Sequence, residues 1–195
     1  QPGVLLALDY RRAFDSVSKD FIIWAFKRFG FGEKITRWIQ VLMANTVSSI
    51  NYMGWISEDF PVDSGIRQGC PFSPTAFIIA LELLAIKIRS EKSIKGIQMP
   101  LPSTSANMNT FLKLAMFADD ISMFLNDKQD VENVFVIVNQ FSVFSGLEIN
   151  KNKTEAMWLG SKKNSQEQYF GIRWKIKLKI LGIFFSNSAC ASCIE

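Results

Sequence analysis

The most constraining stretch of this sequence places two adjacent carboxylates, Asp119 and Asp120, between two apolar runs. Residues 111–125 read FLKLAMFADDISMFL, and apolar runs of this length predict two short buried strands joined by a tight turn. Ionised carboxylates are costly to bury without a counter-charge, and no Lys or Arg lies between Lys113 and Lys128. Two interpretations follow. The pair is either a solvated hairpin turn, since Asp tolerates the backbone angles of such turns, or a divalent-metal site with carboxylate ligands.

Composition limits the class of protein. The chain has 195 residues, of which 48% are apolar and 17 are Phe, so it can form one domain with an ordinary core and is neither disordered nor fibrous. The longest apolar stretch, residues 76–88, contains Glu82 and Lys87 and is too short and too polar to span a bilayer, so we expect no membrane contact. The first residues lead almost directly into a hydrophobic strand, with no signal peptide. We therefore expect an intracellular fragment of a longer polypeptide.

Histidine, cysteine and charge narrow the chemistry. The sequence has no His, which excludes His-based catalytic triads and His-ligated metal sites. Its cysteines are Cys70, Cys190 and Cys193, and the C-x-x-C formed by the last two has no second pair to complete a zinc site, so we expect reduced cysteines. Net charge is +4. Residues 151–195 hold eight basic and three acidic residues, against 14 and 15 before them, which points to a polyanionic partner.

Apolar periodicity and capping residues predict alternating strands and helices. A buried strand at Val4–Leu8 runs directly into Asp9, and further elements follow along the chain. They are a helix capped by Ser18 that buries Phe21, Ile22, Ala25, Phe26 and Phe29; a helix at Glu33–Ala44 that buries Ile35, Trp38, Ile39 and Leu42; a β-hairpin from Val47–Trp55 and Asp59–Val62; a loop at Ser64–Pro74; a helix from Ser73 to about Ser90, apolar nearly all round; a polar loop at Pro100–Thr110; the Asp-Asp hairpin; a helix capped by Asp130 and ended by Gly146; a turn at Leu147–Glu155; and a strand at Ala156–Leu159.

The region Ile172–Phe185 alternates between apolar and cationic side chains and predicts a single strand over its first nine residues. One face carries Ile172, Trp174, Ile176, Leu178 and Ile180, and the other carries Arg173, Lys175, Lys177 and Lys179. The cations either protect an edge strand from aggregation or form a sheet face that touches phosphates, and the sequence leaves both interpretations open.

This order of elements predicts an α+β fold with an antiparallel-rich sheet backed by helices, a split βαβ arrangement of ferredoxin-like type. If the strands are neighbours in one sheet, Asp9, Asp119 and Asp120 meet at one edge, and a Gly/Pro-rich loop opens a buried helix between them. Such carboxylates can hold two divalent ions about 3.5–4 Å apart, and Mg²⁺ favours carboxylates plus substrate phosphates. The chemistry implied is nucleotidyl transfer. It requires the carboxylates to lie within about 8 Å of one another, twice the spacing of the two ions.

Five stretches occur in order along the chain: LALDYRRAFDSV at 6–17, GIRQGCPFSP at 65–74, FADD at 117–120, SGLEINKNKTE at 145–155 and LKILGIFF at 178–185. In order and spacing they resemble motifs A to E of reverse transcriptases, most closely those of the non-LTR (LINE-type) retrotransposon group. The resemblance covers most of residues 4–186, and five ordered motifs are far more specific than any one of them. It implies the palm of an RNA-directed DNA polymerase at residues 1–186, a partial reverse transcriptase domain, and leaves residues 187–195 unassigned.

The resemblance also implies roles for individual residues. Asp9 and Asp119 resemble the metal-binding catalytic aspartates, with Asp120 as the third carboxylate, and Mg²⁺ or Mn²⁺ as the ion. The other implied roles are contact with the incoming nucleotide by Tyr10, Phe14, Gln68 and Gly69, with Phe14 excluding a ribose 2′-hydroxyl; protonation of the leaving pyrophosphate by Lys153; and contact with primer and template by Arg67, Leu181, Gly182, Arg173, Lys175, Lys177 and Lys179. The alternative interpretation of Phe14 is a core residue, and that of Lys153 is a solvated lysine in a turn. Arg12 stands where Lys is commoner, and Phe117 replaces the usual Tyr.

The implied partners are an RNA template, a DNA primer and dNTPs. We expect the fingers, the thumb and an endonuclease to lie outside this sequence, so the isolated chain should be nearly inactive. The alternatives are a catalytically inactive, truncated retroelement relic and a fragment that only binds nucleic acid. The intact aspartates favour descent from an active enzyme. A nucleotide cyclase with a palm-like sheet would lack the GIRQGCPFSP loop.

Overall fold

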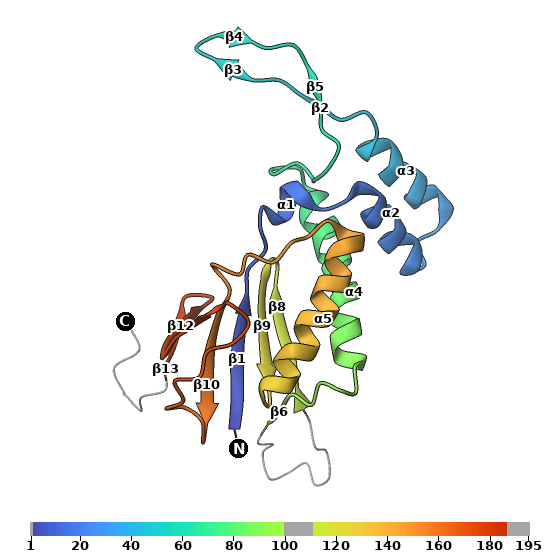
Figure 1. Cartoon of the computed structure of the whole chain (residues 1–195). Helices are drawn as coiled ribbons and strands as arrows, with labels where there is room; N and C mark the ends of the chain where they lie inside the picture. The colour runs from blue at the N-terminus through green and yellow to red at the C-terminus, as the bar shows by residue number, and fades with distance from the viewer. Residues whose placement is uncertain (1, 100–110, 187–195) are drawn as a thin grey trace.

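The computed structural model describes residues 2–99 and 111–186 (Figure 1). The loop expected at Pro100–Thr110 and the tail with Cys190 and Cys193 lie outside these residues. In the described part of the chain, no helix is long and apolar enough to cross a membrane. The helices are α1 (Ala13–Ser16), α2 (Lys19–Arg28), α3 (Glu33–Met43), α4 (Ser73–Ser90) and α5 (Lys128–Ser145). The strands are β1 (Pro2–Leu8), β2 (Val47–Ser48), β3 (Asn51–Tyr52), β4 (Trp55–Ile56), β5 (Phe60–Pro61), β6 (Ile97–Gln98), β7 (Phe111–Leu112), β8 (Leu114–Phe117), β9 (Asp120–Leu125), β10 (Glu155–Gly160), β11 (Arg173–Trp174), β12 (Lys177–Ile180) and β13 (Ile183–Ser186).

The central layer is a five-stranded sheet in the order β11-β10-β1-β9-β8. β1 lies in the middle and pairs antiparallel with β10 on one side and with β9 on the other. β8 adds antiparallel to β9, and the two-residue β11 is parallel to β10. The predicted α+β class, with an antiparallel-rich sheet backed by helices, is therefore confirmed.

Alternation along β1 separates the two faces of this sheet. Leu6 and Leu8 point to the helices and are at most 4% exposed, whereas Leu5 packs on the opposite face with Met157 and Leu178. Leu178 belongs to the β12–β13 hairpin, which covers part of that second face. Both faces of the central strand are thus buried at this level, which explains its continuous apolar sequence.

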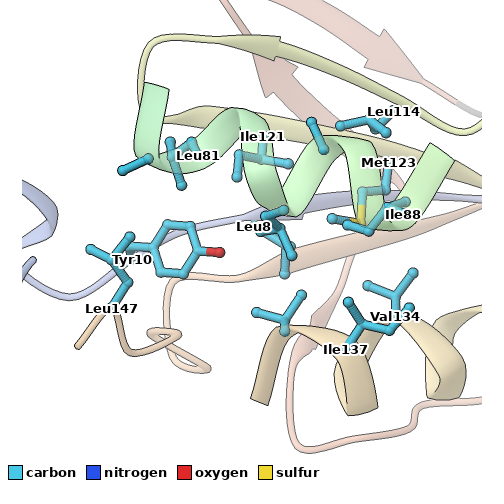
Figure 2. Close-up of a cluster of buried hydrophobic side chains, with 14 of the residues drawn as sticks. Leu8, Tyr10, Leu81, Ile88, Leu114, Ile121, Met123, Val134, Ile137 and Leu147 are labelled. Atoms are coloured by element: carbon cyan, nitrogen blue, oxygen red, sulfur yellow. The ribbon is translucent and has the colours of Figure 1, made fainter. Parts of the chain in front are cut away.

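Helices α4 and α5 pack against the first face of the sheet (Figure 1). Figure 2 shows their side chains meeting those of the strands: Leu81 and Ile88 from α4, Val134 and Ile137 from α5, and Leu8, Ile121 and Met123 from β1 and β9. Fully burying one such side chain contributes about 1.5–3 kcal/mol, so this layer is the main source of stability.

Helices α2 and α3 agree only in part with the burial predicted from the sequence. Ser18 caps α2 as expected, accepting the Phe21 N–H at 3.2 Å. In α3 the predicted face is wrong: Ile39 is buried, but Trp38 is 68% and Leu42 62% exposed. α3 packs mainly on α2 through a narrow strip, so part of its apolar surface stays uncovered. Phe29 and Ile35 are likewise exposed, and so are Ile78 and Ile86 of α4, which is not buried all round.

Residues 47–61 form a two-stranded arm that extends away from the sheet (Figure 1). β2 pairs with β5 at its base and β3 pairs with β4 near its tip, so the expected continuous strand at Val47–Trp55 is wrong. The chain reverses at Met53 and Gly54, both of which have positive φ. Tyr52 and Trp55 face each other across the turn and are 71% and 82% exposed.

The cap of α5 also differs from the prediction. Asp127, not Asp130, is the capping residue, since its carboxylate accepts the Asp130 N–H at 3.0 Å. Asp130 points inward and is 1% exposed. Its carboxylate accepts the main-chain N–H groups of Lys95, Gly96 and Asn126 at 2.9–3.2 Å. One buried side chain therefore ties the segment after α4 to the start of α5.

The predicted nine-residue cationic strand is also wrong, because the chain breaks it into β11 and β12. Trp174 stacks on Trp158 with ring centroids 4.6 Å apart, and Lys175 forms an ion pair with Glu155. Ile176 then turns outward and is 79% exposed. These contacts fix β11 against β10 and free the chain to fold back as the β12–β13 hairpin.

Replacing Asp130 by Asn is expected to lower the free energy of unfolding by about 1–3 kcal/mol, because the amide nitrogen cannot accept the N–H groups that the carboxylate satisfies. Urea denaturation of the variant measures this loss. Glu132→Gln, on the exposed side of the same helix, is the control and should change stability by less than about 0.5 kcal/mol. Equal losses in the two variants would contradict a special role for Asp130.

Candidate active site

Three carboxylates meet where β1 ends and β8 turns into β9. Extending the register of β1 with β9 by one residue beyond Leu8 sets Asp9 opposite Asp120. β8 and β9 are joined by a two-residue turn, Ala118 and Asp119, in which Ala118 has a left-handed φ of 52°. A non-glycine residue in this region is strained, and the ladder on either side of the turn holds it there. The structure thus places Asp9, Asp119 and Asp120 at the same end of the sheet, and a shared metal site stays a prediction.

The carboxylates face the side of the sheet that the helices leave open. Leu8 and Ile121 are buried under the helices, so alternation along the strands turns their neighbours Asp9 and Asp120 to the opposite face. Asp9 is half-buried, and Asp119 and Asp120 are exposed. A ligand can therefore approach Asp9 and Asp120 from this face, and Asp119 is exposed in the adjoining turn.

These carboxylates repel one another without compensation. Within residues 2–99 and 111–186 none of the three forms an ion pair. Partial burial, and next the charges of Asp119 and Asp9, raise the pKa of Asp120 above the usual carboxyl value. Among the same residues, no three His, Cys, Asp or Glu side chains are close enough to enclose a metal ion by themselves. The site is thus an open group of interacting charges and not a closed cage.

The segment that follows α5 runs beside the end of β1 and fixes its main chain. Asn150 donates its N–H to the Asp9 carbonyl at 2.8 Å, and Asp9 donates its own N–H to Thr154 Oγ1 at 3.3 Å. Lys153 lies in the turn between these two residues and is exposed. The structure therefore places the predicted Lys153 next to the main chain of Asp9.

Two glycines hold the segment after β1 through close backbone contacts. A Cβ on Gly65 would lie 2.6 Å from the Asp15 carbonyl oxygen, and one on Gly146 would lie 2.6 Å from that of Ser16. Ile66 also donates its N–H to the Phe14 carbonyl at 2.8 Å. The loop before α4 and the end of α5 thus both contact the main chain of α1. Neither glycine position has room for a side chain.

Phe14 is half-buried, and its ring stacks on Phe77 of α4 with centroids 4.5 Å apart. The ring therefore lies partly in the core, which agrees with the alternative interpretation of Phe14 as a core residue. The same stacking holds the ring at a fixed position, five residues after Asp9 in the sequence. A role in selecting the nucleotide sugar stays a prediction.

A groove of about 1030 Å³ lies between the loop before α4, the end of α3 and the base of the arm. Arg67, Gln68 and Cys70 line it, and Arg67 donates to the Val47 carbonyl at 2.9 Å. Gly69 lies between them, exposed and with a φ of 86°. Sequence reasoning identified the loop but missed the arm as the opposite wall, because nothing in the sequence predicts which way a hairpin projects.

Tyr10 differs from the other predicted nucleotide contacts because its side chain lies in the core. It is 8% exposed, and Figure 2 shows its ring beside Leu147 with the hydroxyl pointing inward. Burial raises the pKa of its phenol, and the hydroxyl has no hydrogen-bond partner. A nucleotide could therefore meet only the main chain at this position.

The primer and template contacts predicted at residues 173–182 do not form one cationic face. Leu181 and Gly182 form the turn of the β12–β13 hairpin, both with positive φ. Lys177 and Lys179 lie 4.1 and 5.4 Å from the centroid of the Phe184 ring. Lys175 is paired with Glu155, and Arg173 is exposed at the separate short strand β11. The hairpin rests on the face of the sheet that also carries Asp9.

A sheet backed by helices, with a two-carboxylate hairpin beside a third carboxylate on its open face, is the arrangement of a polymerase palm. The chain belongs to the reverse transcriptase family: the family model described as "Reverse transcriptase (RNA-dependent DNA polymerase)" matches residues 1–185. The resemblance seen in the five motifs is therefore confirmed.

The chain is similar to proteins of transposable elements. The transposon TX1 uncharacterized 149 kDa protein of Xenopus laevis is 24% identical over 184 residues, covering 93% of this chain and 14% of that protein. The Pol polyprotein of the type-2 retrotransposable element R2DM of Drosophila melanogaster is 27% identical over 146 residues, covering 75% of this chain and 13% of that protein. The chain thus spans about one seventh of the length of these relatives.

Solved structures of telomerase share the fold. Apo telomerase from Candida tropicalis, truncated from its C-terminal domain, has a TM-score of 0.62 at 14% identity, covering 95% of this chain and 34% of that one. Telomerase from Candida tropicalis in complex with a fragment of telomeric RNA has a TM-score of 0.65 at 12% identity, covering 95% and 29%. At these identities the likeness concerns the fold.

Replacing Asp120 by Asn is expected to stabilise the chain at neutral pH. Because the folded state raises the pKa of Asp120, it binds the proton more tightly than the unfolded state, and ionisation at higher pH costs stability. Exposed like charges are worth about 0.2–1 kcal/mol, so the melting temperature at pH 7 should rise by about 1–3 °C. The gain should vanish below about pH 3, where the carboxyl is protonated in both states.

Melting curves at the two pH values measure this difference. Asp59→Asn, on the exposed arm, serves as the control and should leave the melting temperature unchanged at both. A variant of Asp120 that is less stable than the parent at pH 7 would show that the carboxylate is structural.

Proposed function

We propose that this chain is the catalytic palm of an RNA-directed DNA polymerase, which adds dNTPs to a DNA primer on an RNA template by two-metal nucleotidyl transfer. One observation carries the proposal: the register of β1 and β9 sets Asp9 beside Asp120, with Asp119 in the adjoining turn, on the open face of the sheet. Membership of the reverse transcriptase family supports the reaction class.

Asp9, Asp119 and Asp120 would hold the divalent ions. Their donor chemistry fits, because Mg²⁺ takes a few carboxylate oxygens and completes its shell with water and substrate phosphates. The raised pKa of Asp120 is consistent with a site arranged for a cation, since a bound positive charge would relieve the repulsion that raises it. When bound, such ions supply activation of the attacking oxygen and stabilisation of the leaving one, and Mn²⁺ can replace Mg²⁺.

The neighbouring residues would position the nucleotide. Phe14, fixed by its stacking on Phe77, would limit space at the sugar, and Gln68 and Gly69 would contact the base pair from the loop before α4. Tyr10 would contribute its main chain only. Lys153, beside the main chain of Asp9, would protonate the leaving pyrophosphate.

The nucleic acid would lie across the open face and the groove. Arg67 would contact the template from the loop, and Leu181 and Gly182 would support the primer from the turn of the β12–β13 hairpin. Lys177, Lys179 and Arg173 are exposed and would contact phosphates, whereas the ion pair of Lys175 with Glu155 reduces its contribution. The fingers and thumb that complete this clamp, and an endonuclease, would belong to a longer polypeptide.

Mn²⁺ is expected to bind weakly to the chain, and the double variant Asp119→Asn/Asp120→Asn should not bind it. The reason is that the ion would remove a repulsion between uncompensated carboxylates. Paramagnetic broadening of NMR signals during a Mn²⁺ titration reports the site. The control is Glu58→Gln/Asp59→Asn, which removes two adjacent carboxylates from the arm. Identical broadening in the parent and in the Asp119/Asp120 variant would remove the site assignment.

Primer extension tests the proposed reaction. Exchanged for the corresponding segment of a related reverse transcriptase, the chain should support extension of a DNA primer on an RNA template. Asp119→Asn in the chimera should reduce extension to background, and Asp59→Asn should not.

The 195-residue chain on its own should extend primers poorly, because phosphoryl transfer depends on positioning the triphosphate and the duplex. A chimera that folds and binds primer–template but shows no extension would favour the relic or binding-only alternative. Robust extension by the chain alone would show that the palm needs no further clamp.

A further inference from the structure

A second hollow, of about 520 Å³, lies where the end of α5 meets the segment that follows it. Arg11, Lys151 and Glu148 line it together with the amides of Asn139 and Asn152 and the hydroxyl of Ser142. Ile149 and Gly171 complete the lining, and none of the predicted catalytic or nucleotide-binding residues is among these residues.

The hollow lies apart from the carboxylates. Asn139 and Ser142 belong to α5, and α5 covers the face of the sheet opposite to the one that Asp9 and Asp120 face. The lining of the hollow includes none of the three carboxylates, although Arg11 follows Asp9 by two residues. The hollow is therefore a different site from the proposed catalytic centre.

The charges of the hollow favour an anion. Arg11 and Lys151 contribute two positive charges and Glu148 one negative, which leaves an excess of one. Within residues 2–99 and 111–186 neither cation forms an ion pair. The amides of Asn139 and Asn152 add neutral donors, while the Ser142 hydroxyl donates to the Val138 carbonyl at 2.9 Å. The remaining donors thus exceed what the single carboxylate can accept.

Hydrogen bonds fix the main chain at Arg11 and around Lys151 without any ligand. Arg11 donates its N–H to the Glu148 carbonyl at 2.8 Å, and Tyr10 pairs with Ile149 in an antiparallel bridge. Asn150 accepts the N–H groups of Lys153 and Thr154 at 3.0 and 2.8 Å, which closes the turn that carries Lys151. The side chains of both cations therefore start from a fixed main chain, so a ligand has only the side chains to order.

We propose that this hollow binds a phosphate group. The guanidinium of Arg11 offers a planar fork that matches two phosphate oxygens, and Lys151 adds a second positive charge. The phosphate comes either from free pyrophosphate or from the backbone of an RNA strand, since both present the same oxygens. The inference does not require the chain to be an active polymerase.

Isothermal titration with inorganic pyrophosphate, without divalent ions, tests the first source. Arg11→Gln/Lys151→Gln should weaken binding at least about tenfold, because two charge-assisted contacts are lost. The control Lys34→Gln/Arg37→Gln removes one Lys and one Arg from the exposed side of α3 and should change affinity less than about twofold. Glu148→Gln should tighten binding about two- to fivefold, a gain that misfolding cannot produce.

Fluorescence anisotropy with a short single-stranded RNA tests the second source. If the phosphate belongs to RNA, Arg11→Gln/Lys151→Gln should flatten the slope of log affinity against log salt by about 1.4, and the parent protein should bind the RNA more tightly than pyrophosphate. Parent protein that binds neither probe, equal losses in both double variants, or weaker binding by Glu148→Gln would overturn the proposal. None of these readouts depends on primer extension.

Discussion

The pairing of β1 with two strands at once is the constraint on which the rest of the structure depends. Asp9 reaches the site because β1 lies between β9 and β10, and its register with β9 decides which carboxylate stands opposite. A shift of one residue would turn Leu6 and Leu8 out of the core and Asp9 into it, so burial of the leucines and placement of Asp9 are the same requirement. The core under α4 and α5 therefore sets the geometry of the site.

Asp130 and Asp120 show how the surroundings of a carboxylate separate a structural role from a functional one. Asp130 is almost fully buried and accepts three main-chain N–H groups, so its charge is satisfied and it joins two parts of the fold. Asp120 has an elevated pKa and two carboxylate neighbours instead. A carboxylate that accepts main-chain N–H groups stabilises the fold, whereas one placed beside like charges has a raised pKa and is destabilised in its ionised form.

Local sequence predicted the elements well and their partners less well. The apolar runs on either side of Asp119 and Asp120, the Ser18 cap and the Ser73–Pro74 helix start act within a few residues, and each appears in the structure. The face of α3 and the break after Trp174 depend on residues far away in the chain. Trp38 stays exposed because α3 has a neighbour on one side, and Trp174 stops the strand because it stacks on Trp158. The hollow beside α5 was not predicted, since Arg11 and Lys151 are distant in sequence and meet only through the pairing of Tyr10 with Ile149.

The central position of β1 has a consequence for synthesis on the ribosome. β1 is made before both of its partners, β9 (Asp120–Leu125) and β10 (Glu155–Gly160), so its ladder cannot begin to form until β9 has been made. At about 5–20 residues per second, roughly 6–22 s pass with an apolar strand unpaired. Strand edges exposed in this way associate with one another, and the yield of folded protein should therefore depend on how long the nascent segment VLLAL is shielded by a chaperone.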